Sequence, residues 1–102
     1  MECNMAIEDV LSSIEGKWAF LVIGHLKKSP QRFNQLKRNL GSVSTQSLTN
    51  ILRNLEENEI VYRQVFPTVP VSVEYSLTEK GTSLLAILKD MKDLGIKWKN
   101  SG

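Results

Sequence analysis

The chain of 102 residues has little cysteine, histidine or proline and lacks long hydrophobic runs. Its single cysteine, Cys3, cannot form an internal disulfide, and with the single histidine it cannot supply all the ligands of a closed zinc site. The apolar runs are far shorter than the roughly 20 residues of a membrane-spanning helix, and the polar, acidic start lacks the pattern of a secretory signal. These absences predict a cytoplasmic protein with no metal, no cofactor and no membrane partner.

The net charge of +2 is too small to indicate a nucleic-acid-binding protein by itself, but it is unevenly distributed. Residues 27–66 contain seven cations and three acids, whereas the rest of the chain contains six cations and eight acids. A basic middle of this kind is typical of a surface that faces phosphates. A solvated lysine-rich face would give the same count, so the charge supports a DNA-binding surface without establishing one.

Apolar residues recur at helical spacing through most of the chain. This periodicity predicts four helices, over about residues 4–15, 17–28, 32–40 and 44–57. Pro30 ends the second helix because the residue before a proline disfavours the helical region. Gly41 breaks the third helix, and Ser44 is expected to cap the fourth. The apolar stripe of the fourth helix leaves its polar residues on the other side.

The pattern changes to period two after residue 60, which predicts strands. Residues 60–66 are rich in β-branched and aromatic side chains, residues 71–78 alternate, and the proline-bounded tip at 67–70 reads as a hairpin loop. Thr78 is expected to cap a last helix over about residues 79–98. Gly81 is best explained by close packing of the start of that helix against the hairpin.

Two helices joined by a short glycine-containing turn form a helix–turn–helix unit, and a hairpin directly after the second helix makes it a winged one. The sequence therefore predicts one domain over residues 1–102, α+β but mostly α. Its recognition helix is expected at about 44–57 and its wing at about 60–78. In this arrangement the recognition helix enters the major groove while the preceding helix crosses the phosphate backbone.

The fourth helix begins with side chains suited to double-stranded DNA. Gln46 and Asn50 carry planar amides that can pair with N6 and N7 of adenine, and the neighbouring hydroxyls can bond phosphates or base edges. Each residue alone is better explained as a cap or as solvated surface, so the interpretation depends on the whole set together with the winged topology and the local charge. The residues expected to contact DNA are Arg32, Ser44, Thr45, Gln46, Ser47, Asn50, Arg53 and Arg63. Arg63 has the alternative of a bridge to Glu74 across the hairpin.

Two other kinds of function fit the sequence less well than DNA binding. A winged-helix module that binds only proteins would more often expose aromatic anchors where this chain has amides and basic residues. An enzyme is not expected, because the helix–turn–helix region has no nucleophile–base pair and the chain has no glycine-rich phosphate loop.

The sequence resembles the HxlR family of bacterial winged helix–turn–helix regulators, relatives of the MarR type. The matching segments follow the family's order and are Gly16-Lys17-Trp18, Arg32 to Leu36, Ser44 to Glu56, Val61-Tyr62-Arg63, Val69-Pro70 and Val73 to Gly81. The resemblance implies a homodimer built largely from added N- and C-terminal helices, over about residues 4–15 and 79–98. We expect this dimer to be a repressor that binds a near-palindromic operator.

Two features bear on how far the resemblance reaches. The family usually has glycine where this chain has Glu59, and we expect Asn58 to adopt the left-handed backbone in its place. Some members sense electrophiles or oxidants through an N-terminal cysteine, which makes Cys3 the candidate sensor. The acidic neighbours Glu2 and Glu8 oppose formation of a thiolate, whereas the start of a helix favours it.

Overall fold

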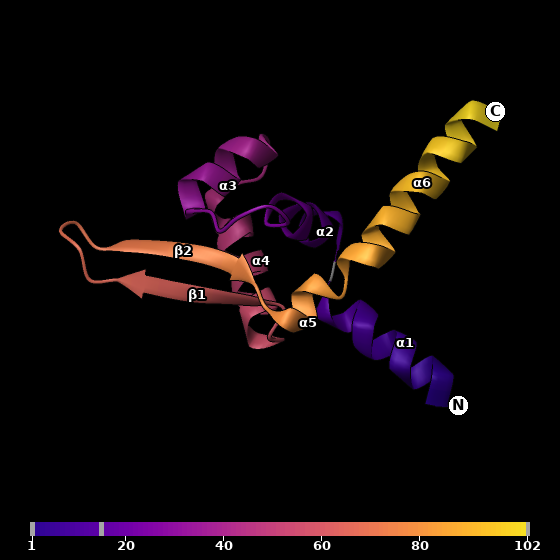
Figure 1. Cartoon of the computed structure of the whole chain (residues 1–102), viewed down its shortest axis with the longest axis horizontal. Helices are drawn as coiled ribbons and strands as arrows, with labels where there is room; N and C mark the ends of the chain where they lie inside the picture. Colours follow the sequence, from indigo (N-terminus) through magenta and orange to yellow (C-terminus); the bar gives the residue numbers. More distant parts are fainter. Residues whose placement is uncertain (1, 15, 102) are drawn as a thin grey trace.

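The computed structural model describes residues 2–14 and 16–101 and is mostly helical, with one small antiparallel sheet. Its elements are α1 (Glu2–Ser13), α2 (Gly16–His25), α3 (Phe33–Leu40), α4 (Thr45–Glu57), β1 (Val61–Phe66), β2 (Ser72–Leu77), α5 (Glu79–Thr82) and α6 (Leu85–Ser101). The order of α3, turn, α4 and hairpin is the predicted winged helix–turn–helix (Figure 1). None of the helices in these two ranges is both long and apolar enough to cross a membrane.

The core lies where α2, α3, α4 and the base of the hairpin meet. Its largest fully buried side chains are Val22, Ile23, Leu36, Leu48, Leu52, Leu55, Ile60 and Val61. Three of these, from Leu48 to Leu55, form the predicted inner stripe of α4. Full burial of a leucine or isoleucine contributes about 1.5–3 kcal/mol, so this stripe fixes which side of α4 remains exposed.

The ends of α4 are closed by local hydrogen bonds. At the start, the Ser44 Oγ accepts from the Ser47 backbone N–H at 3.0 Å, as predicted for an N-cap. At the end, the Ile60 N–H donates to the Leu55 carbonyl at 2.9 Å and the Glu59 N–H to the Glu56 carbonyl at 3.0 Å. This pair of bonds is a Schellman motif.

The residue with the left-handed backbone in that motif is Glu59, with φ of 62°, and not Asn58 as predicted. Asn58 has φ of −89° and caps the helix, since both its backbone N–H and its side-chain Nδ2 donate to the Asn54 carbonyl. The bonds of Asn58 hold it in line with the helix, so the next residue has to make the turn.

Strands β1 and β2 pair in the register Val61↔Leu77 to Phe66↔Ser72, and the tip between them contains a cis Val69–Pro70 bond. A further single-residue bridge joins Gln31 to Tyr75, with N···O distances of 2.9 and 2.8 Å. The loop between α2 and α3 therefore pairs with the edge of β2 and anchors the hairpin to the helical body.

The predicted helix over residues 79–98 is divided in the structure. Thr78 caps α5 by accepting from the Gly81 N–H at 2.9 Å, but the chain turns at Ser83 before α6 begins. The Thr82 and Ser83 hydroxyls donate to the carbonyls of Thr78 and Lys80, and such bonds compete with a continuous helix. A Cβ on Gly81 would overlap the Ile60 carbonyl oxygen, which confirms the predicted close packing against the hairpin.

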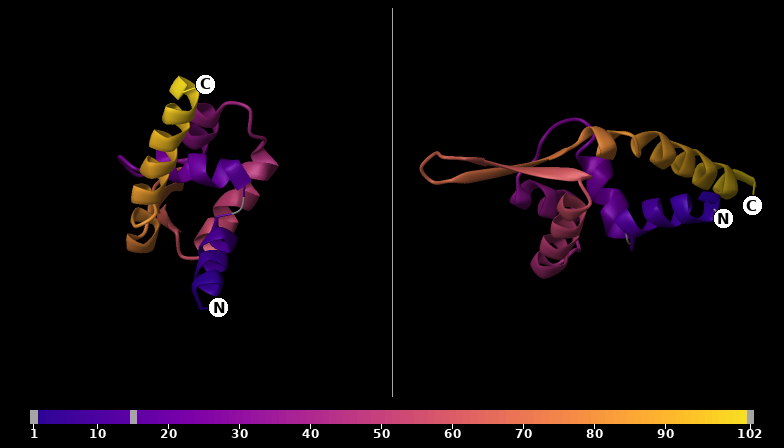
Figure 2. Two further views of the ribbon diagram at one scale, coloured as in Figure 1. Left: turned by 90° about the vertical axis from the view of Figure 1, so that its right-hand side faces the viewer. Right: turned by 90° about the horizontal axis from the view of Figure 1, so that it is seen from below.

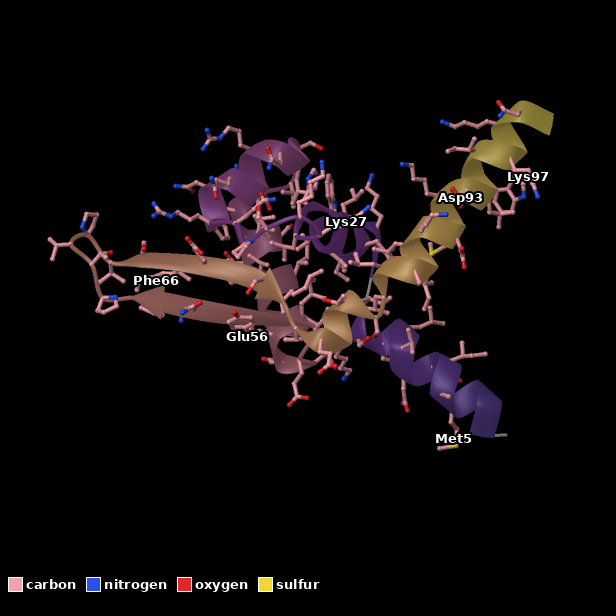
Figure 3. The ribbon with its side chains drawn as sticks, viewed as in Figure 1. Met5, Lys27, Glu56, Phe66, Asp93 and Lys97 are labelled. Atoms are coloured by element: carbon pink, nitrogen blue, oxygen red, sulfur yellow. The ribbon has the colours of Figure 1, made fainter. Side chains whose placement is uncertain are left out.

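Helices α1 and α6 project from the body on the side opposite the wing, and Figure 1 shows them diverging. They account for the elongated shape of 51 × 35 × 23 Å. Helix α1 contacts the body near its end, where Ser13 and Ile14 are buried, whereas residues 5–12 are exposed. Met5, on the part of α1 that extends from the body, is labelled in Figure 3.

Candidate nucleic-acid interface

The outer ridge of α4 is formed by Gln46, Asn50 and Arg53, which follow one another at helical spacing. All three side chains are exposed, and they lie opposite the buried stripe of Leu48 and Leu52. Figure 2 shows α4 projecting from the body beside the hairpin. The ridge is therefore free to enter a groove without disturbing the core.

The hydroxyl groups near the start of α4 differ in whether they are already hydrogen-bonded within the chain. The Ser44 Oγ is engaged in the cap, and the Thr49 hydroxyl donates to the Thr45 carbonyl at 2.8 Å. Thr45 and Ser47 are exposed, and neither hydroxyl has a hydrogen bond among the residues that the structure describes. These two are the hydroxyls best placed to meet an incoming phosphate or base edge.

Charge changes sign along α4 and its C-cap region. Residues 39–52 contain no charged residue, Arg53 follows, and the far end carries the exposed acids Glu56, Glu57 and Glu59. Figure 3 labels Glu56 near the end of the helix. Carboxylates repel phosphates, so only the first half of α4 can lie deep in a groove, and phosphate contact should extend no farther along the helix than Arg53.

Arg53 and Arg63 lie around one hollow between α4 and the hairpin. The hollow has a volume of about 280 Å³, and its other lining residues are Thr49, Leu52, Glu56 and Tyr75. Two guanidinium groups against one carboxylate leave this hollow positively charged. The charge suits a phosphate group, which arginine binds through two parallel N–H donors.

The alternative bridge from Arg63 to Glu74 is wrong. Arg63 pairs directly with Tyr75, whereas Glu74 pairs with Gln64. Residues directly opposite one another share a face of the sheet and successive residues alternate, so Arg63 and Glu74 point to opposite faces.

Arg32 lies at the start of α3, where it is exposed and precedes the first helical residue. The Gln35 side chain accepts from the Arg32 backbone N–H at 2.9 Å, and within the described chain the guanidinium itself has no partner. The bridge between Gln31 and Tyr75 brings this end of α3 to the edge of the hairpin.

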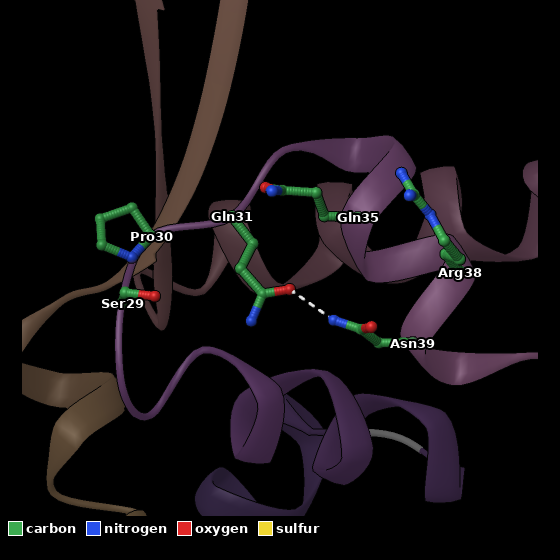
Figure 4. A pocket seen from close by; sticks show the side chains of 6 residues that line it. All are labelled: Ser29, Pro30, Gln31, Gln35, Arg38 and Asn39. Atoms are coloured by element: carbon green, nitrogen blue, oxygen red, sulfur yellow. Dashed lines mark hydrogen bonds between the residues drawn. The ribbon is translucent and has the colours of Figure 1, made fainter.

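A polar hollow of about 290 Å³ lies beside the start of α3 and was not predicted from the sequence. It is lined by Ser29, Pro30, Gln31, Gln35, Arg38 and Asn39 (Figure 4). The Asn39 amide donates to Gln31 Oε1 at 3.0 Å, and Gln31 Nε2 donates to the His25 carbonyl at 2.5 Å. Gln31 thus connects α2, α3 and β2. This role could not be predicted from the sequence, because a single loop residue that bonds to distant segments leaves no periodic pattern.

Cys3 lies within α1, but its side chain falls outside the described part of the structure. The interface described above is formed by residues of α3, α4 and the hairpin.

The exposed polar ridge on a helix that follows a short turn and precedes a hairpin defines a winged helix–turn–helix protein. The chain belongs to the HxlR-like helix-turn-helix family, whose model matches residues 13–102. It shares 41% identity over 92 residues with the HTH-type transcriptional regulator BH0655 of Halalkalibacterium halodurans, covering 89% of this chain and 81% of that one. YodB, an HTH-type transcriptional regulator of Bacillus subtilis, is 41% identical over 86 residues, covering 84% and 77%.

Solved structures of regulators also resemble this chain in fold and sequence. The redox regulator HypR in its reduced form superposes with a TM-score of 0.87 at 38% identity, covering 94% of this chain and 95% of that one. The reduced form of YodB from B. subtilis gives 0.84 at 37% identity, covering 95% of each chain. These relatives regulate transcription and are not enzymes, as the sequence predicted for this chain.

Proposed function

We propose that this chain is a sequence-specific DNA-binding regulator that places the first half of α4 in the major groove of double-stranded DNA. The observation that carries the proposal is the uncharged, exposed amide ridge of α4 flanked by cations on either side. Phosphate contacts position a protein on DNA and base contacts supply sequence information. This chain has residues of both kinds in the order that a helix in the groove needs.

The cations have separate positions in the proposed complex. Arg53 and Arg63 hold one backbone phosphate in the hollow between α4 and the wing, and Arg32 holds another from the start of α3. Ser44 caps the recognition helix, while Thr45 and Ser47 meet phosphates at its free end, where unpaired backbone N–H groups also favour anions.

The regulator acts as a homodimer through α1 and α6. The apolar residues left exposed on these two helices include Met5, Ile7, Val10, Leu11, Ile87, Met91, Leu94 and Ile96, each between 40% and 63% exposed. Ala6, Ile7, Val10, Leu11 and Ile87 together line an apolar hollow of about 370 Å³. Apolar side chains exposed together on two neighbouring helices are typical of a protein–protein interface, and a second copy offers a matching surface.

Two-fold symmetry then determines the form of the operator. Each subunit presents one α4, so the dimer binds a near-palindromic site with half-sites about one helical turn, or 34–36 Å, apart. We expect binding to repress transcription from a promoter that contains the site.

Cys3 is the proposed sensor of oxidants or electrophiles in the cytoplasm. The support comes from relatives, since HypR is described as a redox regulator and YodB has been solved in diamide-treated and quinone-bound forms. A lone cysteine can form a disulfide only with its counterpart in the second subunit or with a small thiol. In the first case two thiols lose two protons and two electrons, and diamide takes them up as it becomes a hydrazine.

The decisive experiment is a gel-shift titration of the full chain against the DNA that flanks its own gene, followed by a random duplex library at low salt. We expect retarded complexes at nanomolar to micromolar protein. Absence of binding to both would reject the proposal and favour a winged-helix module that binds proteins. For the sensor, diamide should release DNA from the wild-type protein but not from Cys3→Ser.

A further inference from the structure

The part of α4 that can approach DNA is neutral. No Asp, Glu, Lys or Arg occurs in residues 39–52, and the nearest cations are Arg38 before the segment and Arg53 after it. Gln46 and Asn50 are the amides on the exposed ridge, one turn apart. The two side chains have no partner among the described residues, so their donors and acceptors are available.

Neutral amides select bases differently from charged side chains. Arginine and lysine are the usual partners of guanine O6 and N7, and carboxylates accept from cytosine N4, whereas Gln and Asn pair with N6 and N7 of adenine. The first half of α4 lacks the residues that favour a G·C pair and has two that favour an A·T pair.

Resting on the proposed DNA binding by α4, we propose that Gln46 and Asn50 each read one adenine, so that each half-site contains two A·T pairs. Four residues of helix rise about 6 Å, and successive base pairs are about 3.4 Å apart. The two adenines are therefore about two base pairs apart.

Arg53 is the residue that could instead read guanine, because it continues the same ridge. Its side chain lines the hollow that also contains Arg63 and Tyr75, and a phosphate there would occupy both guanidinium groups. This placement assigns Arg53 to the backbone and leaves base selection to the two amides.

The test begins with selection of bound duplexes from a random library by the full chain at low salt. We expect two A·T positions in each half-site, about two base pairs apart. Enrichment of G·C pairs at these positions would overturn the adenine readout while leaving DNA binding intact. Failure to enrich any duplex would overturn the proposed function itself, and the readout with it.

The selected duplex is then made with 7-deazaadenine, which loses the N7 acceptor but keeps normal pairing with thymine. We expect each replacement to weaken binding roughly five- to a hundredfold. In Gln46→Ala, one of the two base replacements should cause no further loss of affinity. In Asn50→Ala, the other replacement should cause no further loss.

The matched control is Gln64→Ala, which removes an exposed amide on β1 from the face opposite to Arg63. This variant should respond to both replacements like the wild type. Circular dichroism checks that each variant folds. We expect this of the two α4 variants because alanine is the best helix former, and of Gln64→Ala because the Gln64 side chain is exposed and lies outside the core. If both replacements retain their full effect in the amide variants, or if Arg53→Ala alone removes the base preference, the proposal is wrong.

Discussion

The winged body and the terminal helices differ in how far their apolar residues are buried. In the body, α2, α3, α4 and the base of the hairpin bury their leucines, isoleucines and valines against one another within one chain. Helices α1 and α6 leave much of theirs exposed. The core of the body is therefore closed within one chain, whereas much of the apolar surface of the terminal helices stays uncovered.

Charge pairs contribute little to the stability of the terminal helices. The ion pair between Lys89 and Asp93 on α6, at 3.0 Å, is the only one among residues 2–14 and 16–101. Its hydrogen bond raises the pKa of Lys89, but both side chains are exposed, and such pairs stabilise a helix weakly. In the proposed dimer, apolar contact between subunits would stabilise these helices more than this ion pair does.

The largest expected effect is on the body. Gly81→Ala should destabilise the chain by about 3 kcal/mol or more, because the added Cβ meets the backbone carbonyl of Ile60, which cannot move aside. Urea unfolding measures the loss. The matched control is Gly24→Ala in α2, where a Cβ meets nothing within 4 Å. The free energy of unfolding of that variant should rise by up to about 1 kcal/mol. Equal effects of Gly81→Ala and Gly24→Ala would contradict the packing of Gly81 against Ile60.

The second effect concerns the terminal helices. Leu11→Glu should raise the dissociation constant of the proposed dimer by about a hundredfold or more, because a side chain that the partner would cover in each subunit becomes charged. Sedimentation equilibrium follows the change in mass. Val71→Glu, which replaces an equally exposed apolar residue on the wing, should remain dimeric. A dimer unaffected by Leu11→Glu would show that α1 does not form the interface.

A smaller effect is expected at the charged hollow. Arg53→Ala or Arg63→Ala should weaken binding to specific and non-specific duplexes alike and reduce the salt slope of a dimer by about 2, one phosphate contact per subunit. Fluorescence anisotropy at several salt concentrations gives the slope. Lys97→Ala, on the part of α6 farthest from the wing, should leave it unchanged (Figure 3). A loss limited to one sequence would instead identify a base contact.

The smallest effect should be a gain in stability. Glu59→Gly should stabilise the body by about 1 kcal/mol, because glycine accepts a positive φ without strain. Thermal unfolding should show a rise of about 4–8 °C. Glu57→Gly, inside the last turn of α4, should instead lower the stability by a similar amount, because glycine is a poor helix former. A loss at both positions would mean that Glu59 makes a contribution that its backbone does not reveal.

The winged fold could be predicted because its signals are local and agree. The stripe from Leu48 to Leu55 shows the inner side of α4, Ser44 marks its start, and the change of period near residue 60 marks the hairpin. The two amides of the candidate site follow from the same stripe, since residues off it have to be exposed.

The features that the sequence did not reveal depend on contacts between distant segments or on competition between neighbours. The partner of Arg63 depends on strand register, which places Tyr75 and not Glu74 beside it. The hollow shared by Arg53 and Arg63 exists only once α4 packs against the sheet. The turn at Ser83 and the left-handed Glu59 each reflect a local hydrogen bond that outweighs propensity.

The neutral segment from residue 39 to residue 52 has a consequence for how such a regulator could diverge. If the cations outside the segment supply the affinity and the amides inside it supply the choice of bases, the two can change independently. Substitution of Gln46 or Asn50 by another small polar residue leaves the net charge and the core untouched. A duplicated gene could thus acquire a new operator in one or two mutational steps while keeping its overall strength of binding to DNA.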